Sequence, residues 1–344
     1  MPRRSVWLFV IVNLLFVAFL VNSVWTLLSL LVVDGAEDRI SRAELPGPNS
    51  DVKARQRVIP KIIHQTYINE SIPAHWKVAQ QSCLDLHEDY EYKLWTDKAS
   101  REFIAAEFPW FLETFDGYAF PIQRADAIRY FVLAHYGGVY IDLDDGCQRR
   151  LDPLLTYSAW VRRTIPTGIS NDVMGSVPHH PFFLKVIDAL PRYDRSWLLP
   201  YITVMGSTGP LFLSIIWRHY NNEGHDSDDE RIRLLFPDEY NKNSWSFFSH
   251  HLGNSWHRAD VKLILWMAQH WVFLTVLGFI LAGVFFFGVW WLYGRFISSP
   301  ASRVRTRRIW FWRRRGGSGT VKIGDHDVPL LERRNSDLED RRVE

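Results

Sequence analysis

The sequence predicts an α/β domain flanked by two membrane-spanning helices. Short apolar strands alternate with helical stretches between residues 58 and 262, and this alternation is typical of a sheet covered by helices. Two apolar runs lie on either side: Ser5 to Val33 carries no charge, and Val272 to Tyr293 is apolar on every helical face. Each run is long enough to cross a bilayer as one helix.

Basic residues lie on the outer side of both apolar runs. Arg3 and Arg4 precede the first, and Arg295 with an arginine-rich stretch over 303–315 follows the second. Positive charge marks the cytosolic side, so we expect both termini in the cytosol and the region between the helices in the lumen. The first run is too long for a cleaved signal and is predicted to be an anchor. The sequon Asn69-Glu70-Ser71 is consistent with a lumenal domain.

The predicted organisation has five segments. Residues 34–57 are rich in Pro, Gly, Ser and charge and are expected to form a stalk. The tail is polar beyond Gly316 and is expected to be largely disordered. The predicted segments are residues 1–33, the cytosolic N-terminus and first span; 34–57, the stalk; 58–262, the lumenal domain; 263–294, the second span; and 295–344, the basic cytosolic tail.

The charge and the cysteines exclude some classes. A formal net charge of +2 gives no indication of nucleic-acid binding. Cys83 and Cys147 are too few for a disulfide framework and have the wrong spacing for a zinc site. They either pair in an oxidising lumen or stay as separate buried thiols.

The elements of the domain follow from residue patterns. Strands are predicted at 60–65 and 91–95, and helices at 76–87 and 98–108. Pro121 suits the first turn of a further helix, and Gly137-Gly138 ends it. The apolar triplet Val139-Tyr140-Ile141 then predicts a strand whose carboxyl end, where ligands of open α/β sheets bind, carries an acidic loop.

Asp142, Asp144 and Asp145 crowd this loop. They repel one another unless a cation or an arginine neutralises them. An extended backbone points Asp142 and Asp144 the same way, and oxygen ligands favour magnesium or manganese bridged to a diphosphate. A solvated turn is the alternative reading.

The helix before the loop adds two charged candidates. Asp126 and Arg129 are three residues apart and share a face. With Tyr140 and the acidic loop they could surround one small polar ligand. A purely structural ion pair and a half-buried strand tyrosine are the alternatives.

Several ordered motifs resemble one known family. They are Ile59-Pro60-Lys61-Ile62-Ile63-His64-Gln65-Thr66, Arg124-Ala125-Asp126-Ala127-Ile128-Arg129-Tyr130, the segment Tyr136 to Asp144, and Gly253-Asn254-Ser255-Trp256. Together they resemble the DXD-containing glycosyltransferase family 32. The stretches 170–178 and 205–211, with the two flanking helices, are similar to the catalytic subunits of fungal mannosyl-inositol phosphorylceramide synthases.

The resemblance implies an activity. It implies a GT-A fold, a GDP-mannose donor, an inositol phosphorylceramide acceptor, retention of anomeric configuration and a Mn²⁺ (or Mg²⁺) cofactor. It further implies a Golgi membrane location and a regulatory multi-span membrane subunit as partner. A family relative that acts on a different lipid or glycan is the alternative.

The resemblance also assigns roles to residues. Asp142 and Asp144 would be catalytic and hold the metal, with Asp142 and Tyr140 also near the ribose. Asp126, Arg129 and Asn171 would hold the donor sugar, and Tyr67 could stack on the base. The terminal loop 249–257 would close over the diphosphate through Ser255 and Trp256; His251, Asn254, Ser255 and His257 are its candidate metal ligands, of which His251 is taken here.

The acidic loop also allows a reaction mechanism and alternative classes of protein to be considered. The resemblance implies front-side displacement at a diphosphate that the metal stabilises, and Asp145 or Asp172 acting as a base is the alternative. Trp245, Phe247 and Phe248 could dip into the lipid interface or pack in the core. A metal-dependent phosphotransferase would need further ligands or a phosphate-binding glycine loop, and no G-x-x-x-x-G-K pattern is present. A non-catalytic scaffold with a lipid-binding basic tail would leave the lumenal motifs unexplained.

Overall fold

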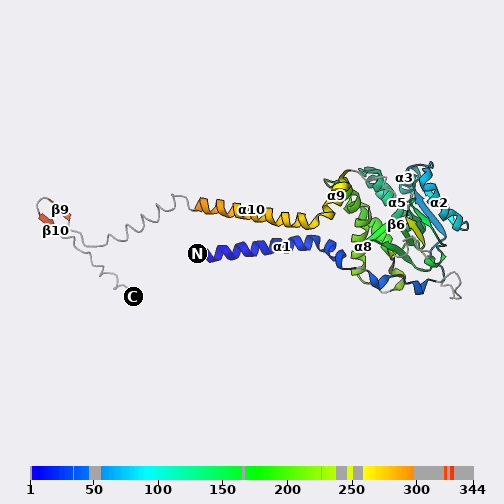
Figure 1. Cartoon of the computed structure of the whole chain (residues 1–344), viewed down its shortest axis with the longest axis horizontal. Coiled ribbons are helices and arrows are strands. Elements are labelled where there is room, and N and C mark those ends of the chain that lie inside the picture. The colour runs from blue at the N-terminus through cyan, green and yellow to red at the C-terminus, as the bar shows by residue number, and fades with distance from the viewer. Residues whose placement is uncertain are drawn as a thin grey trace, which may run out of the picture. The chain divides into compact units, whose positions relative to one another are not determined.

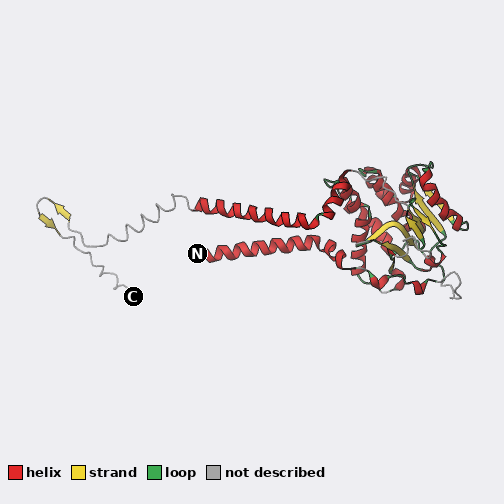
Figure 2. Ribbon diagram, in the orientation of Figure 1, coloured by secondary structure: helices red, strands yellow, loops and turns green. Residues whose placement is uncertain are grey.

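The computed structural model describes residues 2–33, 35–45, 56–164, 167–225, 227–237, 246–250, 259–297, 321–323 and 326–328. They belong to two compact units, Met1–Leu263 and Ile264–Glu344. Figure 1 traces the chain and Figure 2 shows that the first unit mixes helices and strands. The predicted α/β class is therefore confirmed.

A mixed six-stranded sheet forms the centre of the first unit, with strand order β2-β1-β3-β6-β5-β7. β1 runs parallel to β2 and β3, β6 runs antiparallel to both β3 and β5, and β7 is parallel to β5. The strands are β1 (Ile62–Thr66), β2 (Glu91–Trp95), β3 (Gly138–Ile141), β5 (Ala159–Arg163), β6 (Ile169–Ser176) and β7 (Ile232–Leu235).

Helices cover both faces of this sheet. The sequence patterns predicted three of them: α2 (Ala74–Leu86), α3 (Asp97–Glu107) and α5 (Pro121–Tyr136). Alternation along β3 divides the core, because Val139 and Ile141 pack with Cys83 of α2 on one face while Tyr140 packs under α5 on the other. The remaining helices of the domain are α4 (Leu112–Gly117), α6 (Pro181–Tyr193), α7 (Pro200–Ser207) and α8 (Pro210–Asn222), with 3-10 turns η3 (Pro109–Phe111), η4 (Asp152–Thr156) and η5 (Asp228–Glu230).

A small second sheet carries the acidic loop. β4 (Asp145–Cys147) pairs antiparallel with β8 (Phe248–His250), so Asp145 stands opposite His250. Cys147 of β4 forms a disulfide with Cys83, which answers the question that the sequence left open. Of the two alternatives for Phe247 and Phe248, core packing is confirmed, because both side chains are fully buried beside Trp160 on the α2 face of the sheet. Trp245 lies outside the described residues.

The segment predicted as a stalk is partly packed on the domain. Its first half forms η1 (Ala36–Asp38) and η2 (Arg42–Glu44), and the Ile40 amide donates to the Leu234 carbonyl of the edge strand β7 at 2.9 Å. Ile40 is buried there. Residues 35–45 therefore cover an edge that would otherwise expose backbone groups.

The two apolar runs form helices that differ in whether they are long and apolar enough to cross a membrane. In α10 (Trp271–Ile297), residues Trp271–Leu292 are long and apolar enough to cross a membrane. In α1 (Pro2–Val32), only Asn13–Asn22 and Trp25–Val32 taken together pass that test, with a 59° bend between them. Among the described residues there is thus one candidate span, and the N-terminal span stays a prediction. A short helix α9 (Ala259–Gln269) precedes α10, and β9 (Val321–Ile323) pairs with β10 (His326–Val328) in the tail.

Candidate active site

A glycine turn places the acidic loop. Gly137 and Gly138 have φ of +65° and +93°, which L side chains rarely adopt. A Cβ on Gly138 would lie 2.7 Å from the Ile62 carbonyl oxygen. Only glycine allows β3 to start so close to β1, and β3 then delivers Asp142 at its carboxyl end.

His64 braces this turn from β1. Its Nδ1 accepts from the Trp95 indole at 3.0 Å, so Nε2 carries the proton and donates to the Gly137 carbonyl at 2.8 Å. Burial lowers the pKa of His64 to about 4. The histidine is neutral and structural.

Arg129 links the helix α5 to the acidic loop. Its guanidinium lies 3.0 Å from Asp126 and 3.3 Å from Asp142, and it donates to the Asn171 carbonyl at 2.6 Å. It also lies over the Tyr140 ring, 4.7 Å from the centroid. The Tyr140 hydroxyl donates to Asp142 at 2.7 Å, since residues i and i+2 share a side of an extended chain.

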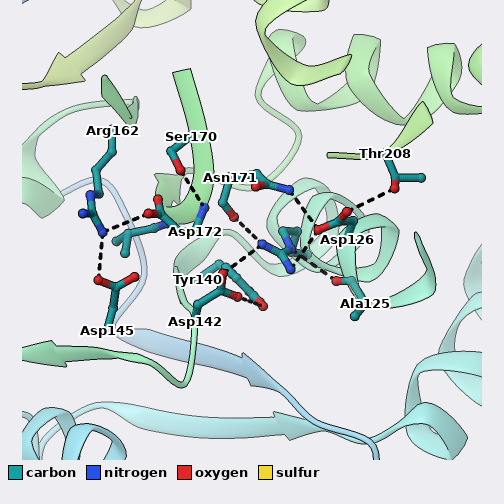
Figure 3. A network of polar contacts seen from close by, with 12 residues as sticks. Ala125, Asp126, Tyr140, Asp142, Asp145, Arg162, Ser170, Asn171, Asp172 and Thr208 are labelled. Carbon is teal, nitrogen blue, oxygen red and sulfur yellow. Dashed lines mark hydrogen bonds and ion pairs between the residues drawn. The ribbon is translucent and has the colours of Figure 1, made fainter. Parts of the chain in front are cut away.

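Asp126 is satisfied entirely within the protein. Besides Arg129, its carboxylate accepts from the Asn171 amide at 3.0 Å and from the Thr208 hydroxyl at 3.1 Å. The Tyr130 hydroxyl accepts from the same Asn171 amide and donates to the Thr208 carbonyl. Helix α5, strand β6 and the end of α7 thus meet in one buried polar cluster (Figure 3).

A second cluster holds the other end of the loop. Arg162 of β5 lies 3.0 Å from Asp145 and 3.1 Å from Asp172, which β6 supplies. His250 of β8 lies 3.3 Å from the same Asp145 oxygen. Asp145 is fully buried, so this ion pair keeps a charge where desolvation alone would neutralise it.

The three aspartates of the acidic loop differ in the direction in which their pKa is shifted. Burial raises the pKa of Asp142 to about 7, and the Asp144 charge adds to this although Arg129 opposes it. Burial and the Asp145 charge raise the pKa of Asp144 to about 6. Burial acts upward on Asp145 too, but the Arg162 and His250 contacts hold its pKa below its usual value. The bond to Asp145 raises the pKa of His250.

The loop has the donor set of a metal site. One ligand atom from each of Asp144, Asp145 and His250 lies within 4.8 Å of the other two. The second carboxylate oxygen of Asp145 is buried and has no hydrogen-bond partner among the described residues. Carboxylate oxygens with one imidazole suit a divalent cation such as Mn²⁺, so these residues fit the implied group.

The structure brings most of the predicted site residues together. Asp126, Arg129, Tyr140, Asp142 and Asn171 form one bonded cluster, and Asp144 lies beside it in the loop. Tyr67 follows β1 and its ring meets Trp76 edge-on at 5.6 Å, so base stacking stays a prediction. His251, Ser255 and Trp256 lie outside the described residues.

Sequence reasoning missed some residues of the site. Arg162 lies in a strand with no local motif, and Thr208 follows α7, about 80 residues from its partner Asp126. His250 lies in the terminal loop 249–257 but is not among the ligands predicted there. The β4–β8 pairing, which places His250 opposite Asp145, is the signal that selects it.

Comparisons with known proteins identify the family of the chain. The family described as a glycosyltransferase sugar-binding region containing a DXD motif matches residues 73–160. The chain is 50% identical to the Saccharomyces cerevisiae mannosyl phosphorylinositol ceramide synthase SUR1 over 86% of its own length and 74% of the relative's. It is 55% identical to the Schizosaccharomyces pombe inositol phosphoceramide mannosyltransferase 2 over 65% of this chain and 66% of that protein. Among solved structures, the PaToxG glycosyltransferase covers 50% of this chain and 73% of its own, with 19% identity and a TM-score of 0.39. On the length and identity of these sequence matches, the chain belongs to the family of mannosyl phosphorylinositol ceramide synthases and inositol phosphoceramide mannosyltransferases.

Proposed function

We propose that the chain transfers mannose from GDP-mannose to inositol phosphorylceramide, with retention of anomeric configuration, and so makes mannosyl-inositol phosphorylceramide. The observation that carries this is the acidic loop: Asp144, Asp145 and His250 lie together at the end of β3, beside the buried Arg129 cluster. Family membership supports the substrates, because the relatives named above are mannosyl and inositol phosphoceramide enzymes.

The cluster residues would bind and orient the donor. Arg129 is fixed by two carboxylates and a carbonyl, which suits a preorganised guanidinium facing sugar hydroxyls or phosphate. Asp126 has no unsatisfied oxygen in the described contacts, so we assign it to holding Arg129 and Asn171 in place. Tyr140 and Asp142 would face the ribose.

A divalent cation, Mn²⁺ or Mg²⁺, would be held by Asp144 with His250 and a second carboxylate. Asp142 is the sequence-based choice for that carboxylate, but its two oxygens already accept from Tyr140 and Arg129. Asp145 offers the unpartnered oxygen, so we place it in the shell as the third protein ligand. Bound there, the cation would supply Lewis-acid stabilisation of the departing diphosphate.

The acid–base chemistry favours front-side displacement. Asp145 and Asp172 both pair with Arg162, and the lowered pKa of Asp145 makes it a poor proton acceptor. With these two alternatives disfavoured, the donor diphosphate itself is the remaining group to help deprotonate the acceptor hydroxyl.

The location follows from the same reading. We propose a GT-A fold with a lumenal catalytic domain in the Golgi membrane, both termini cytosolic and a second, N-terminal span. The Cys83–Cys147 disulfide supports the lumen, since disulfides persist in oxidising compartments. A regulatory multi-span subunit is part of this proposal through family resemblance alone.

The test uses the full chain in proteoliposomes with radiolabelled GDP-mannose and inositol phosphorylceramide. We expect mannosylated lipid with Mn²⁺ and none with a chelator. Asp144→Asn should lose transfer and Mn²⁺ binding while its thermal midpoint changes little. Asp116→Asn, an exposed acid paired with Arg101, is the matched control and should stay active. Full activity of Asp144→Asn, or transfer only to another acceptor, would contradict the proposal.

A further inference from the structure

The loop between α6 and α7 presents an apolar tip to solvent. Leu198 is 97% exposed and Trp197 is 58% exposed, and Ile202 on the first turn of α7 adds a third exposed apolar side chain. Soluble surfaces rarely gather large apolar residues in this way unless something covers them. The tip is thus a candidate contact surface outside the polar site.

The tip is held in a defined shape. Thr203 is buried, and its hydroxyl accepts from the Trp197 amide at 2.8 Å and lies 3.2 Å from the Trp197 carbonyl and 3.3 Å from the Leu199 carbonyl. This single side chain ties the loop to the first turn of α7. Hydrogen bonds between the Thr203 side chain and the loop backbone therefore hold Trp197 and Leu198 in their outward position.

Helix α7 connects the tip to the site. It begins at Pro200 beside the tip and ends at Ser207, where the Ser207 hydroxyl accepts from Gln123 and the next residue, Thr208, bonds Asp126. Eight residues of α-helix span about 12 Å. A surface in contact with the tip therefore lies about 12 Å along this helix from the donor cluster, the buried polar cluster of Asp126, Arg129 and Asn171.

That distance is a few ångströms longer than the polar layer on one side of a bilayer. One headgroup layer is about 5–8 Å thick. A lipid whose chains stay at the level of the tip would have its headgroup reach toward Thr208 without leaving the membrane. Arg195, exposed two residues before Trp197, adds a cation beside the tip, and a guanidinium suits the phosphate of a lipid headgroup.

Helix α1 contacts α8, the helix that packs on α7. α7 leads directly into α8, and Arg218 of α8 donates to the Ser29 hydroxyl of α1 at 3.2 Å. Figure 1 draws α8 at the side of the domain that α1 enters. The exposed residues of α1 are almost all apolar, as expected of a helix in contact with lipid.

From these observations we infer that Trp197, Leu198 and Ile202 insert into the lumenal leaflet and hold the donor site just above the lipid headgroups. This inference rests on the proposed function for the lipid nature of the acceptor and for the lumenal side of the membrane. The tryptophan would sit at the interface, as tryptophans do, with Leu198 deeper.

The depth of the tip in the membrane can be measured without an enzyme assay, and it tests the inference directly. Both native cysteines are in the disulfide, so Leu198→Cys adds the one free thiol, which is labelled with an environment-sensitive fluorophore in the full chain. In proteoliposomes containing nitroxide lipids we expect several-fold stronger quenching than for Val78→Cys. Val78 is also exposed, but lies on α2 at the opposite face of the sheet. Equal quenching at the two sites overturns the inference, and would leave a protein partner as the occupant.

Acceptor choice gives a second readout. Trp197→Ser with Leu198→Ser should lower transfer to a long-chain acceptor in vesicles about tenfold, through lost local concentration, and leave transfer to a short-chain acceptor in solution unchanged. Trp110→Ser, an equally exposed tryptophan elsewhere, should alter neither. Equal loss on both acceptors refutes an insertion role. If the wild type uses no acceptor at all, the proposed function fails, while the depth measurement still decides the insertion.

Discussion

Replacing Arg129 by methionine should destabilise the protein strongly. The guanidinium is 4% exposed, and its removal leaves the Asp126 and Asp142 carboxylates without their shared cation. Breaking a buried pair in this way costs about 3–5 kcal/mol, because the remaining charge stays desolvated. We therefore expect Arg129→Met to lower the free energy of unfolding by at least that amount.

Arg101→Met is the matched control. Arg101 makes two bonds to Asp116, at 2.9 and 2.8 Å, but the two side chains are 54% and 40% exposed. An exposed pair contributes at most about 1 kcal/mol. Urea denaturation of the full chain in detergent, followed by circular dichroism, compares the two variants.

The double variant Arg129→Met with Asp126→Asn isolates the cause. If the uncompensated charge is responsible, neutralising Asp126 should recover part of the loss. Equal destabilisation by Arg129→Met and Arg101→Met would refute the reasoning, since the burial of the pair would then have no energetic consequence.

Three further outcomes are expected. Because burial lowers the pKa of His64 to about 4, the unfolded chain binds a proton that the folded chain does not between about pH 6.5 and 4. Stability should fall by about 3 kcal/mol as pH drops through that window, and the urea midpoint of His64→Gln should lose that part of its pH dependence. Replacing Cys83 and Cys147 by serine opens a link across a sequence separation of 64, and should cost about 4 kcal/mol in the same denaturation assay; an unchanged midpoint would contradict the pairing. Asn69 is exposed, so glycosidase treatment should increase the mobility of the wild type on a gel and leave Asn69→Gln unaffected if the domain is lumenal.

Local patterns in the sequence predicted the helix and the strand that carry much of the candidate site. Pro121 and Gly137-Gly138 bound helix α5 as expected, and the apolar triplet after them forms β3. These predictions succeed because helix ends and strand alternation are decided by residues a few positions apart. The same locality made Asp126, Arg129, Tyr140 and Asp142 readable as neighbours.

The sequence by itself thus determined the α/β class, the acidic loop and the α5–β3 unit that carries Asp126, Arg129 and Tyr140. Only the tertiary structure decided which distant groups complete the site: Arg162 beside Asp145, Thr208 on Asp126, and His250 opposite Asp145 through the β4–β8 pair. It also buried Phe247 and Phe248, which the sequence left ambiguous, and exposed Trp197 and Leu198 instead. The physical reason is that burial and long-range pairing depend on how whole elements pack, and an aromatic or charged residue has the same local pattern in either environment.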